Sequence, residues 1–323
     1  MVLDQDDPEL KSGGPGPQGT MSGPGAQTSI ARRRQWLTPY AYLSPFLVFL
    51  AVFGIFPILY SVYLSLTSTA GNGAGAGLLS NYTTGDRDFR FLSSSENIGE
   101  YVLIWLPTLI VLVFVAALLL DQRPGRFATA MRVLFYVPGA LAGSASVLVW
   151  LFMLDPSVSP FKIVFQILGL SNVNQVITPP HIATIVAIIA IFTGSGAWIV
   201  IVYGALSGIP REMLEAAALD GCGQVRLAWN IKLPQIRRYA VLIVVLSFAT
   251  GTQVFVEPTI LYSAGAGFVS PTWSINELSY FYAFTYGRFG VSAALSVELF
   301  LVSLLIAVVV VLKTGFLSAG QSR

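Results

Sequence analysis

Six long apolar stretches are the feature that most constrains how this chain can fold. A transmembrane helix needs about 20 mainly apolar residues to cross the roughly 30 Å of hydrocarbon in a bilayer. Each stretch is too long for an ordinary core strand, and a membrane β-barrel would instead show segments of about ten residues with alternating hydrophobicity. The stretches cover residues 40–66, 101–120, 133–154, 182–206, 240–256 and 291–312. The sequence therefore predicts an all-α integral membrane protein with six transmembrane helices.

The composition fits a chain folded in lipid and excludes several other classes of protein. Hydrophobic residues make up 54% of the 323 residues and charged residues only 11%, against roughly 25% charged residues in soluble proteins. Cys222 is the only cysteine, so no disulfide scaffold can form, and the net charge of +2 does not suggest a nucleic-acid partner. His181 is the only histidine, which excludes metal sites that need two imidazoles.

The lysine and arginine residues predict the orientation, because the cytoplasmic loops of membrane proteins carry an excess of them. If the N-terminus is cytoplasmic, the outside segments hold only Arg87, Arg90, Lys162 and Arg288. The other 14 of the 18 basic residues then lie inside, namely Lys11, Arg32, Arg33, Arg34, Arg123, Arg126, Arg132, Arg211, Arg226, Lys232, Arg237, Arg238, Lys313 and Arg323. The sequence therefore predicts that both ends of the chain are cytoplasmic.

The two ends of the chain are expected to be tails. Residues 1–38 contain an acidic cluster and a Gly/Pro-rich run, which cannot bury enough apolar surface to fold, so we expect a disordered cytoplasmic tail. The arginines at 32–34 precede an apolar stretch too long for a signal peptide, which predicts an uncleaved anchor. Residues 39–312 then form the transmembrane domain, and residues 313–323 form a second cytoplasmic tail.

The longest cytoplasmic connection, residues 207–238, has the local signals of a helical hairpin. Pro210 suits the first position of a helix, where its missing N–H costs nothing. Gly221 and Gly223 permit the positive φ angles that end a helix. A second helical segment is expected to end before Pro234, because proline bars a continuous helix. We predict two short helices joined by a glycine turn, a shape that suits a docking element.

Eight residues of this loop have a distinctive spacing. They are Glu215, Ala216, Ala217, Asp220, Gly221, Ile231, Leu233 and Pro234. The pattern resembles the cytoplasmic signature of permease subunits of ATP-binding-cassette (ABC) importers, in the maltose-type family for sugar uptake, and the resemblance extends over about residues 39–312. Cys222 and Ala228 depart from it, since the family usually has an alanine and an aromatic residue there. The simpler alternative is an alanine-rich hairpin that packs on the membrane surface.

In such a family the permease subunit is not an enzyme and has no catalytic residues. The resemblance implies a complex in the cell membrane, with a second permease subunit that is usually a different chain, two cytoplasmic ATPase subunits, and an external solute-binding protein that delivers a sugar. This chain has no G-x-x-x-x-G-K-[ST] loop for nucleotide phosphates. ATP and magnesium would therefore bind to the partner ATPase, and this chain would hold no cofactor and no metal.

The resemblance also implies roles for the residues of the hairpin. The helix before Gly221 would sit in a cleft of the ATPase, where Glu215 offers a carboxylate to an arginine and Ala216 and Ala217 permit close approach. Asp220 would alternatively cap the second helix. The residues expected to fix the loop against the membrane helices are Ile231, Leu233 and Pro234.

Four residues at membrane depth are candidates for the solute pathway. An ionisable residue inside a span is a functional candidate by default, which selects Glu298. A sugar site also needs amide and hydroxyl partners and an aromatic face, which Gln253, Thr252 and Trp198 provide. The alternative is that these side chains are ordinary contacts between helices in lipid. The aromatic residues of 280–286 are expected to form an interfacial belt or a contact for the binding protein.

A second class of function stays open, namely an ion-coupled secondary carrier or channel for a small polar solute. That class needs buried charges arranged for ion coupling, yet the predicted spans contain only Glu298, with Glu257 at a margin. A multi-pass membrane enzyme would need clustered acidic or histidine residues, which the sequence lacks. If this chain could be purified alone as a stable and active transporter, the ABC-importer hypothesis would be refuted.

Overall fold

The computed structural model describes residues 42–67, 78–123, 125–140, 143–264 and 269–314, and the regular elements within these ranges are all helices. The predicted tail 1–38 and most of the predicted tail 313–323 lie outside the described residues. The chain divides into two compact units, residues 1–57 and 58–323. The described part of the first unit is helical and contains a π-helical stretch, η1 (Leu50–Ile55), in which no side chain is buried. The prediction of an all-α fold is confirmed for the described residues.

Five of the described helices are long and apolar enough to cross a membrane, and each overlaps a predicted span. They are Tyr42–Leu66, Phe89–Asp121, Pro179–Ser207, Gln224–Gly251 and Phe289–Lys313. The predicted span 133–154 is instead divided between two helices, α5 (Arg126–Ala140) and α6 (Gly143–Leu154), which are bent by 101°. The described helices therefore provide five candidate spans, or six if the bent pair is counted as one.

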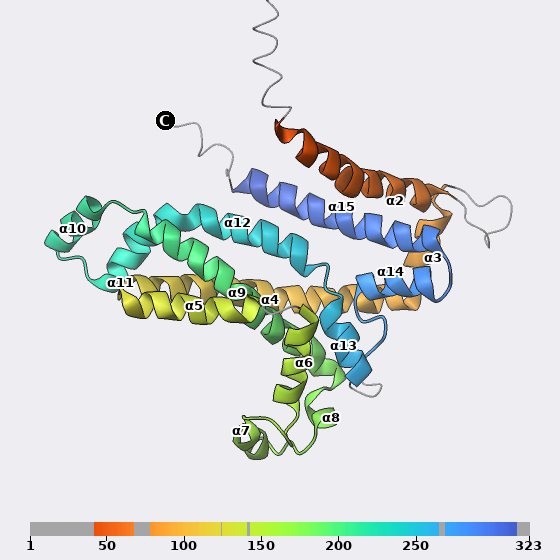
Figure 1. Ribbon diagram of the computed structural model, residues 1–323, viewed down its shortest axis with the longest axis horizontal. Coiled ribbons are helices and arrows are strands. Elements are labelled where there is room, and N and C mark those ends of the chain that lie inside the picture. The colour runs from red at the N-terminus through yellow and green to blue at the C-terminus, as the bar shows by residue number, and fades with distance from the viewer. Residues whose placement is uncertain (1–41, 68–77, 124, 141–142, 265–268, 315–323) are drawn as a thin grey trace, which may run out of the picture. The chain divides into compact units, whose positions relative to one another are not determined.

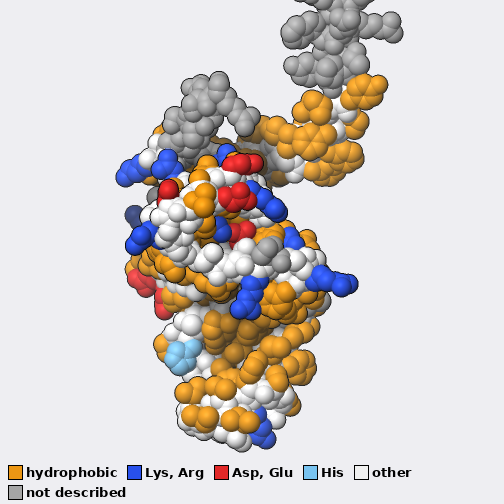
Figure 2. Space-filling model, turned by 90° about the vertical axis from the view of Figure 1, so that its left-hand side faces the viewer, with side chains coloured by type: hydrophobic (Ala, Val, Ile, Leu, Met, Phe, Trp, Pro, Cys, Tyr) orange, Lys and Arg blue, Asp and Glu red, His pale blue; other side chains and the backbone are white. Residues whose placement is uncertain are grey.

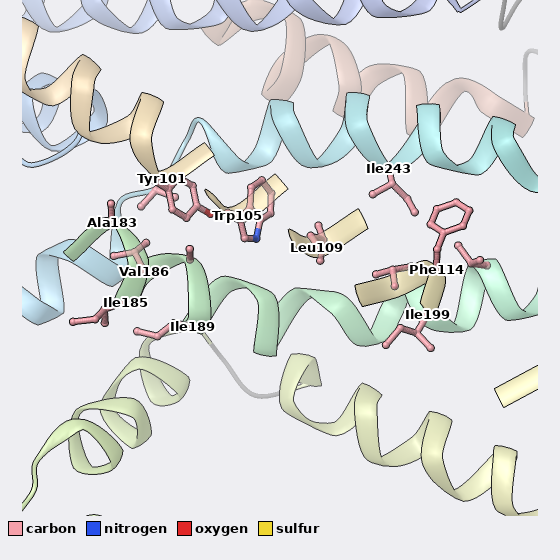
Figure 3. Packing of buried hydrophobic residues seen from close by; sticks show 14 of the residues in the cluster. Tyr101, Trp105, Leu109, Phe114, Ala183, Ile185, Val186, Ile189, Ile199 and Ile243 are labelled. Atoms are coloured by element: carbon pink, nitrogen blue, oxygen red, sulfur yellow. The ribbon is translucent and has the colours of Figure 1, made fainter. Parts of the chain in front are cut away.

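The core of the second unit is built on one face of α4 (Phe89–Asp121). This face packs against α9 (Ile182–Ser207) and α12 (Leu233–Gly251), and Figure 3 shows Ile199 and Ile243 of those helices turned toward it. Because lipid tails are as apolar as these side chains, close van der Waals packing is what holds such helices together. The buried positions of α4 recur at the spacing of one helix face, at Tyr101, Trp105, Leu109, Val113 and Ala117.

Two glycines let α5 and α9 approach each other closely. A side-chain carbon at Gly196 would overlap the backbone carbonyl of Phe135, and one at Gly139 would overlap the backbone oxygen of Thr193. Contacts of this kind at small residues are a common way of packing helices in membranes. The absence of a side chain at these two positions therefore sets the distance between the helices.

The predicted fifth span ends earlier than expected. α12 stops at Gly251, and a separate helix, α13 (Val256–Ala264), begins after a short connection. Gly251 lies against the ring of Trp105, where any side chain would collide. Glu257, which was expected at the margin of this span, lies in the first turn of α13.

Several short helices complete the second unit. Asn81, in α3 (Ser80–Asp86), donates hydrogen bonds from its side-chain amide to the backbone oxygens of Ser65 and Thr67, at 2.9 and 2.8 Å. These bonds satisfy carbonyl groups that the end of α2 (Phe56–Leu66) would leave without partners. The other short helices are α7 (Lys162–Ile167), α8 (Val173–Val176), η2 (Pro179–His181), α10 (Arg211–Leu219), α11 (Gln224–Leu227), η3 (Ala228–Lys232) and α14 (Ile275–Phe284). α15 (Phe289–Lys313) is the last helix.

Within the second unit, α10 and α11 lie at one end of the long helices and α14 lies at the other (Figure 1). The view onto the end that carries α10 has acidic and basic side chains gathered in one part of the surface and mainly hydrophobic side chains in another (Figure 2). The hairpin thus belongs to a charged end of a largely apolar molecule.

Candidate functional site

The predicted hairpin exists, and its first helix and its turn follow the local signals of the sequence. α10 begins after Pro210, which is the residue before the helix rather than its first position. The helix ends in a turn in which the N–H groups of Gly221 and Cys222 donate to the carbonyls of Ala218 and Ala217, at 3.1 and 3.0 Å. Gly221 has a φ of +77°, which is the left-handed conformation that glycine adopts without strain.

The second half of the hairpin differs from the prediction. Gly223 has an ordinary φ of −67° and precedes α11, so it is not a positive-φ position. Asp220 ends α10 instead of capping the following helix, whose first residues receive no side-chain cap. The second helix is also not short, because α11, η3 and α12 form one helical path over Gln224–Gly251.

Pro234 does not break this path, and the reason is the π-helical turn that precedes it. In an α-helix, proline loses one hydrogen bond and its ring collides with the carbonyl four residues earlier. η3 is wider than an α-helix because its bonds join residues five apart, and such turns are frequent at functional sites. Pro234 is the second residue of α12 and follows this wider turn directly. The prediction that the helix ends before Pro234 was wrong for this reason.

The hairpin has one anchored face and one free face. Leu214 packs against the core, and the thioether sulfur of Met213 accepts a hydrogen bond from the side-chain amide of Gln235 at 2.8 Å. Leu233 also packs against the core, whereas Pro234 is exposed. Among the other predicted hairpin residues, Ile231 and Ala217 are half-buried, and the exposed ones are Glu215, Ala216, Asp220 and Gly221.

Sequence reasoning missed a largely buried ion pair at the base of the hairpin. Lys232, the last residue of η3, donates from its ammonium to a carboxylate oxygen of Asp121 at 2.5 Å. Asp121 is the last residue of α4, 111 positions earlier in the chain. Neither residue belongs to the motif, and only the folded arrangement brings them together.

The four predicted pathway residues do not form one site. Thr252 and Glu298 line a cavity of about 450 Å³ between α4, α12 and α15. The hydroxyl of Thr252 lies 3.0 Å from that of Ser303, and one carboxylate oxygen of Glu298 is buried without a hydrogen-bond partner in the part of the chain that the structure describes. Two of the four candidates, Thr252 and Glu298, therefore share one cavity.

Gln253 lines a second cavity, of about 230 Å³, at the break between α12 and α13. Tyr101 and Trp105, which stack with ring centres 5.4 Å apart, also line it, as does Glu257. Trp198 packs against the core and is a lining residue of neither cavity. Tyr101 and Trp105 belong to α4, and they were not predicted as site residues because their spacing on α4 reads as an ordinary core face.

The aromatic cluster of α14 lies around a charged pair at the end opposite to the hairpin. The guanidinium of Arg90 lies 4.9 Å from the centre of the Phe281 ring and donates to the carboxylate of Asp88 at 2.6 Å. The hydroxyl of Tyr282 donates to the same carboxylate at 2.7 Å. The Arg90 side chain, through this hydrogen bond, lowers the pKa of Asp88 to about 2. The cluster is thus built around a carboxylate that stays ionised.

Comparisons with known proteins identify what the chain is similar to. No protein-family model matches it. A probable ABC transporter permease protein of Pyrococcus horikoshii is 29% identical over 90% of this chain and 100% of the relative. The trehalose/maltose transport system permease protein MalF of Thermococcus litoralis is 27% identical over 89% of this chain and 97% of the relative.

A solved structure supports the fold independently. The chain matches a subunit of a bacterial alginate ABC transporter, solved in complex with an alginate pentasaccharide-bound periplasmic protein. The TM-score is 0.72 and the identity 18%, over 86% of this chain and 93% of that chain. The resemblance inferred from the hairpin motif is confirmed, since the curated homologues are ABC transporter permeases for sugars. With its apolar helices, the chain is a multi-pass membrane protein.

Proposed function

We propose, from its homology to ABC transporter permeases, that this chain is the membrane-spanning subunit of an ATP-driven importer for a sugar or a sugar derivative. It would form half of the translocation pathway, with the other half contributed by a second permease subunit, expected to be a different chain. The observation that carries the proposal is the exposed, glycine-turned hairpin between α9 and α12, in a chain whose homologues are sugar permeases. Hydrolysis of ATP would take place on a partner.

The proposed topology has six spans, with α5 and α6 together forming the third, and both ends of the chain in the cytoplasm. The excess of basic residues supports this orientation, since it groups the hairpin with the segments predicted to be inside. The hairpin then faces the compartment that contains ATP.

The free face of the hairpin is proposed to dock into a cleft of a cytoplasmic ATPase subunit. Glu215 is exposed and its carboxylate suits a bidentate contact with an arginine. The small side chain of Ala216 permits close approach, and Gly221 supplies the turn. Leu233 supports the proposed anchoring role by packing against the core. ATP and magnesium would bind to the ATPase, of which two copies are proposed, and this chain would hold no cofactor.

The opposite end of the molecule is proposed to receive an extracytoplasmic solute-binding protein. The structure of the alginate transporter contains a periplasmic protein with bound alginate pentasaccharide, and that complex supports a partner of this kind. The aromatic cluster around Arg90 lies at this end and is a candidate contact.

The solute pathway is proposed to include Thr252, Gln253, Glu298 and Trp198. The two cavities support this proposal for the first three, because each combines hydrogen-bonding groups with apolar walls, as sugar sites do. For Trp198, the support is only its aromatic type and its place on α9.

One observation favours the second candidate, an ion-coupled carrier or channel. The carboxylate of Glu298 faces a cavity within a candidate span and has one buried oxygen without a partner in the described part of the chain. An ion or proton could occupy such a site. A single acidic residue supports this class less well than the hairpin supports the importer.

The experiment that tests the proposal is co-expression of this chain with a candidate ATPase and a second permease, followed by purification and an assay of ATP hydrolysis stimulated by the loaded binding protein. Glu215→Lys should abolish the stimulation while the protein still inserts into the membrane. Lys313→Glu, a charge reversal of the same size at the exposed end of α15 and outside the hairpin, serves as the matched control and should have no effect. Normal stimulation in the Glu215→Lys complex would contradict the docking role.

A further inference from the structure

The ion pair between Asp121 and Lys232 lies where the hairpin joins the membrane helices. Its two side chains are only 17% and 9% exposed, respectively. Leu120, which precedes Asp121, and Ile236, about one helical turn after Lys232, are buried apolar residues. In the part of the chain that the structure describes, this is the one ion pair between distant segments, because the other joins residues 88 and 90.

Stability alone does not account for such a pair. Removing two charges from water costs free energy that their attraction often fails to repay, so an apolar pair of similar size would hold the two helices together about as well. The best-attested use of a buried ion pair is to fix one geometry among several. The pair therefore points to a need for a defined position at this junction.

The junction connects the hairpin to α4 through a short series of contacts. α10 is tied to the first turn of α12 by the bond between Met213 and Gln235. Lys232 comes directly before α12, at the end of the π-helical turn, and bonds to the end of α4. α4 in turn carries Ile98 of the larger cavity and Trp105 of the smaller one. A displacement of α10 thus has a direct route to the helix that lines both cavities.

We infer that Asp121 and Lys232 are positioning residues that transmit the movement of the hairpin to α4. The inference rests on the proposed function, since it requires an ATPase to move the hairpin. The pair fixes the end of α4 to the base of the hairpin, so that both move as one body when the ATPase closes. Without the pair, the hairpin moves while α4 lags, and ATP is hydrolysed without transport.

The test compares variants in the complete complex, reconstituted in proteoliposomes, and measures both saccharide uptake and ATP hydrolysis. Lys232→Met and Asp121→Asn should each lower the uptake per ATP hydrolysed by roughly 5- to 150-fold, the usual range for coupling between sites. The double variant Asp121→Asn/Lys232→Met has no unpaired charge and should assemble normally but stay uncoupled. The charge exchange Asp121→Lys/Lys232→Asp should recover coupling.

Lys313→Met is the matched control, because Lys313 is an exposed lysine at the end of α15, outside the hairpin, and its loss should leave coupling as in the wild type. If the neutral double variant couples as well as the wild type, the pair only avoids an unpaired charge and the inference is overturned. Normal coupling in both single variants would overturn it as well. If the wild-type complex shows no solute-dependent hydrolysis at all, the proposed function has failed, and that result is distinct from a failure of the ion pair.

Discussion

Replacing Gly196 by alanine tests the close contact between α5 and α9. The added carbon would overlap the backbone carbonyl of Phe135 and press on the backbone of Tyr136. Both are backbone atoms of a helix, so no side-chain rotation can relieve the overlap and the two helices must separate. Gly194 is the matched control, because it lies on the same helix two residues earlier and a side-chain carbon there meets no atom within 4 Å in the described structure.

The two substitutions share one effect and differ in another. Alanine is more favourable than glycine inside a helix by about 0.5–1 kcal/mol, which applies equally to both positions. Overpacking a well-fitted contact costs about 1–3 kcal/mol, which applies only at Gly196. We therefore expect Gly194→Ala to be neutral or slightly stabilising. Gly196→Ala should be less stable than Gly194→Ala by about 1–3 kcal/mol.

The assay is thermal or denaturant unfolding of the purified protein in a bilayer mimic, with the two variants measured in parallel. Gly139→Ala provides an independent check from the opposite helix, because its added carbon would overlap the backbone oxygen of Thr193. It should behave like Gly196→Ala. Equal stability of Gly196→Ala and Gly194→Ala would refute the close contact.

Three further predictions concern the hairpin and the opposite end of the molecule. Gly221→Ala should destabilise the turn by roughly 1–2 kcal/mol because Gly221 has a positive φ. The loss should be measurable as faster amide hydrogen exchange in α10, and Gly223→Ala should leave that exchange unchanged. Asn81 begins an Asn-Tyr-Thr acceptor sequence but is 1% exposed, so mass spectrometry of protein from a glycosylating host should find it unmodified. Burial raises the pKa of Glu277 from 4.5 to about 7. Between these values the folded state binds the proton more tightly, so stability should fall as the pH rises through this window, and Glu277→Gln should flatten the profile.

The sequence predicted the long helices well because their signal is local. A stretch long enough to span the bilayer reads as a helix whatever its neighbours are. The breaks were harder to predict, since they depend on contacts between segments. α12 stops at Gly251 against the ring of Trp105, a residue almost 150 positions earlier, and the π-helical turn that accommodates Pro234 leaves no mark in the apolar pattern.

The candidate site divides in the same way. Gly221 could be predicted as the turn of the hairpin because a glycine after an alanine-rich helix is a local signal, and its φ of +77° agrees. Gln253 and Glu298 were selected by residue type alone, and the structure assigns them to different cavities. The pair of Asp121 and Lys232 was not predicted, because charges 111 positions apart are matched only by the packing of α4 on the base of the hairpin.

The most direct test of the central claim is solute uptake into proteoliposomes that contain this chain, a second permease subunit, the ATPase and the binding protein. Labelled saccharides, including trehalose and maltose, are supplied outside, with ATP or an imposed ion gradient as the only energy source. If the chain belongs to an ATP-driven importer, saccharide uptake should require both ATP and the binding protein. The Glu215→Lys variant should abolish this uptake. Uptake driven by the ion gradient without ATP, or by this chain alone, would contradict it.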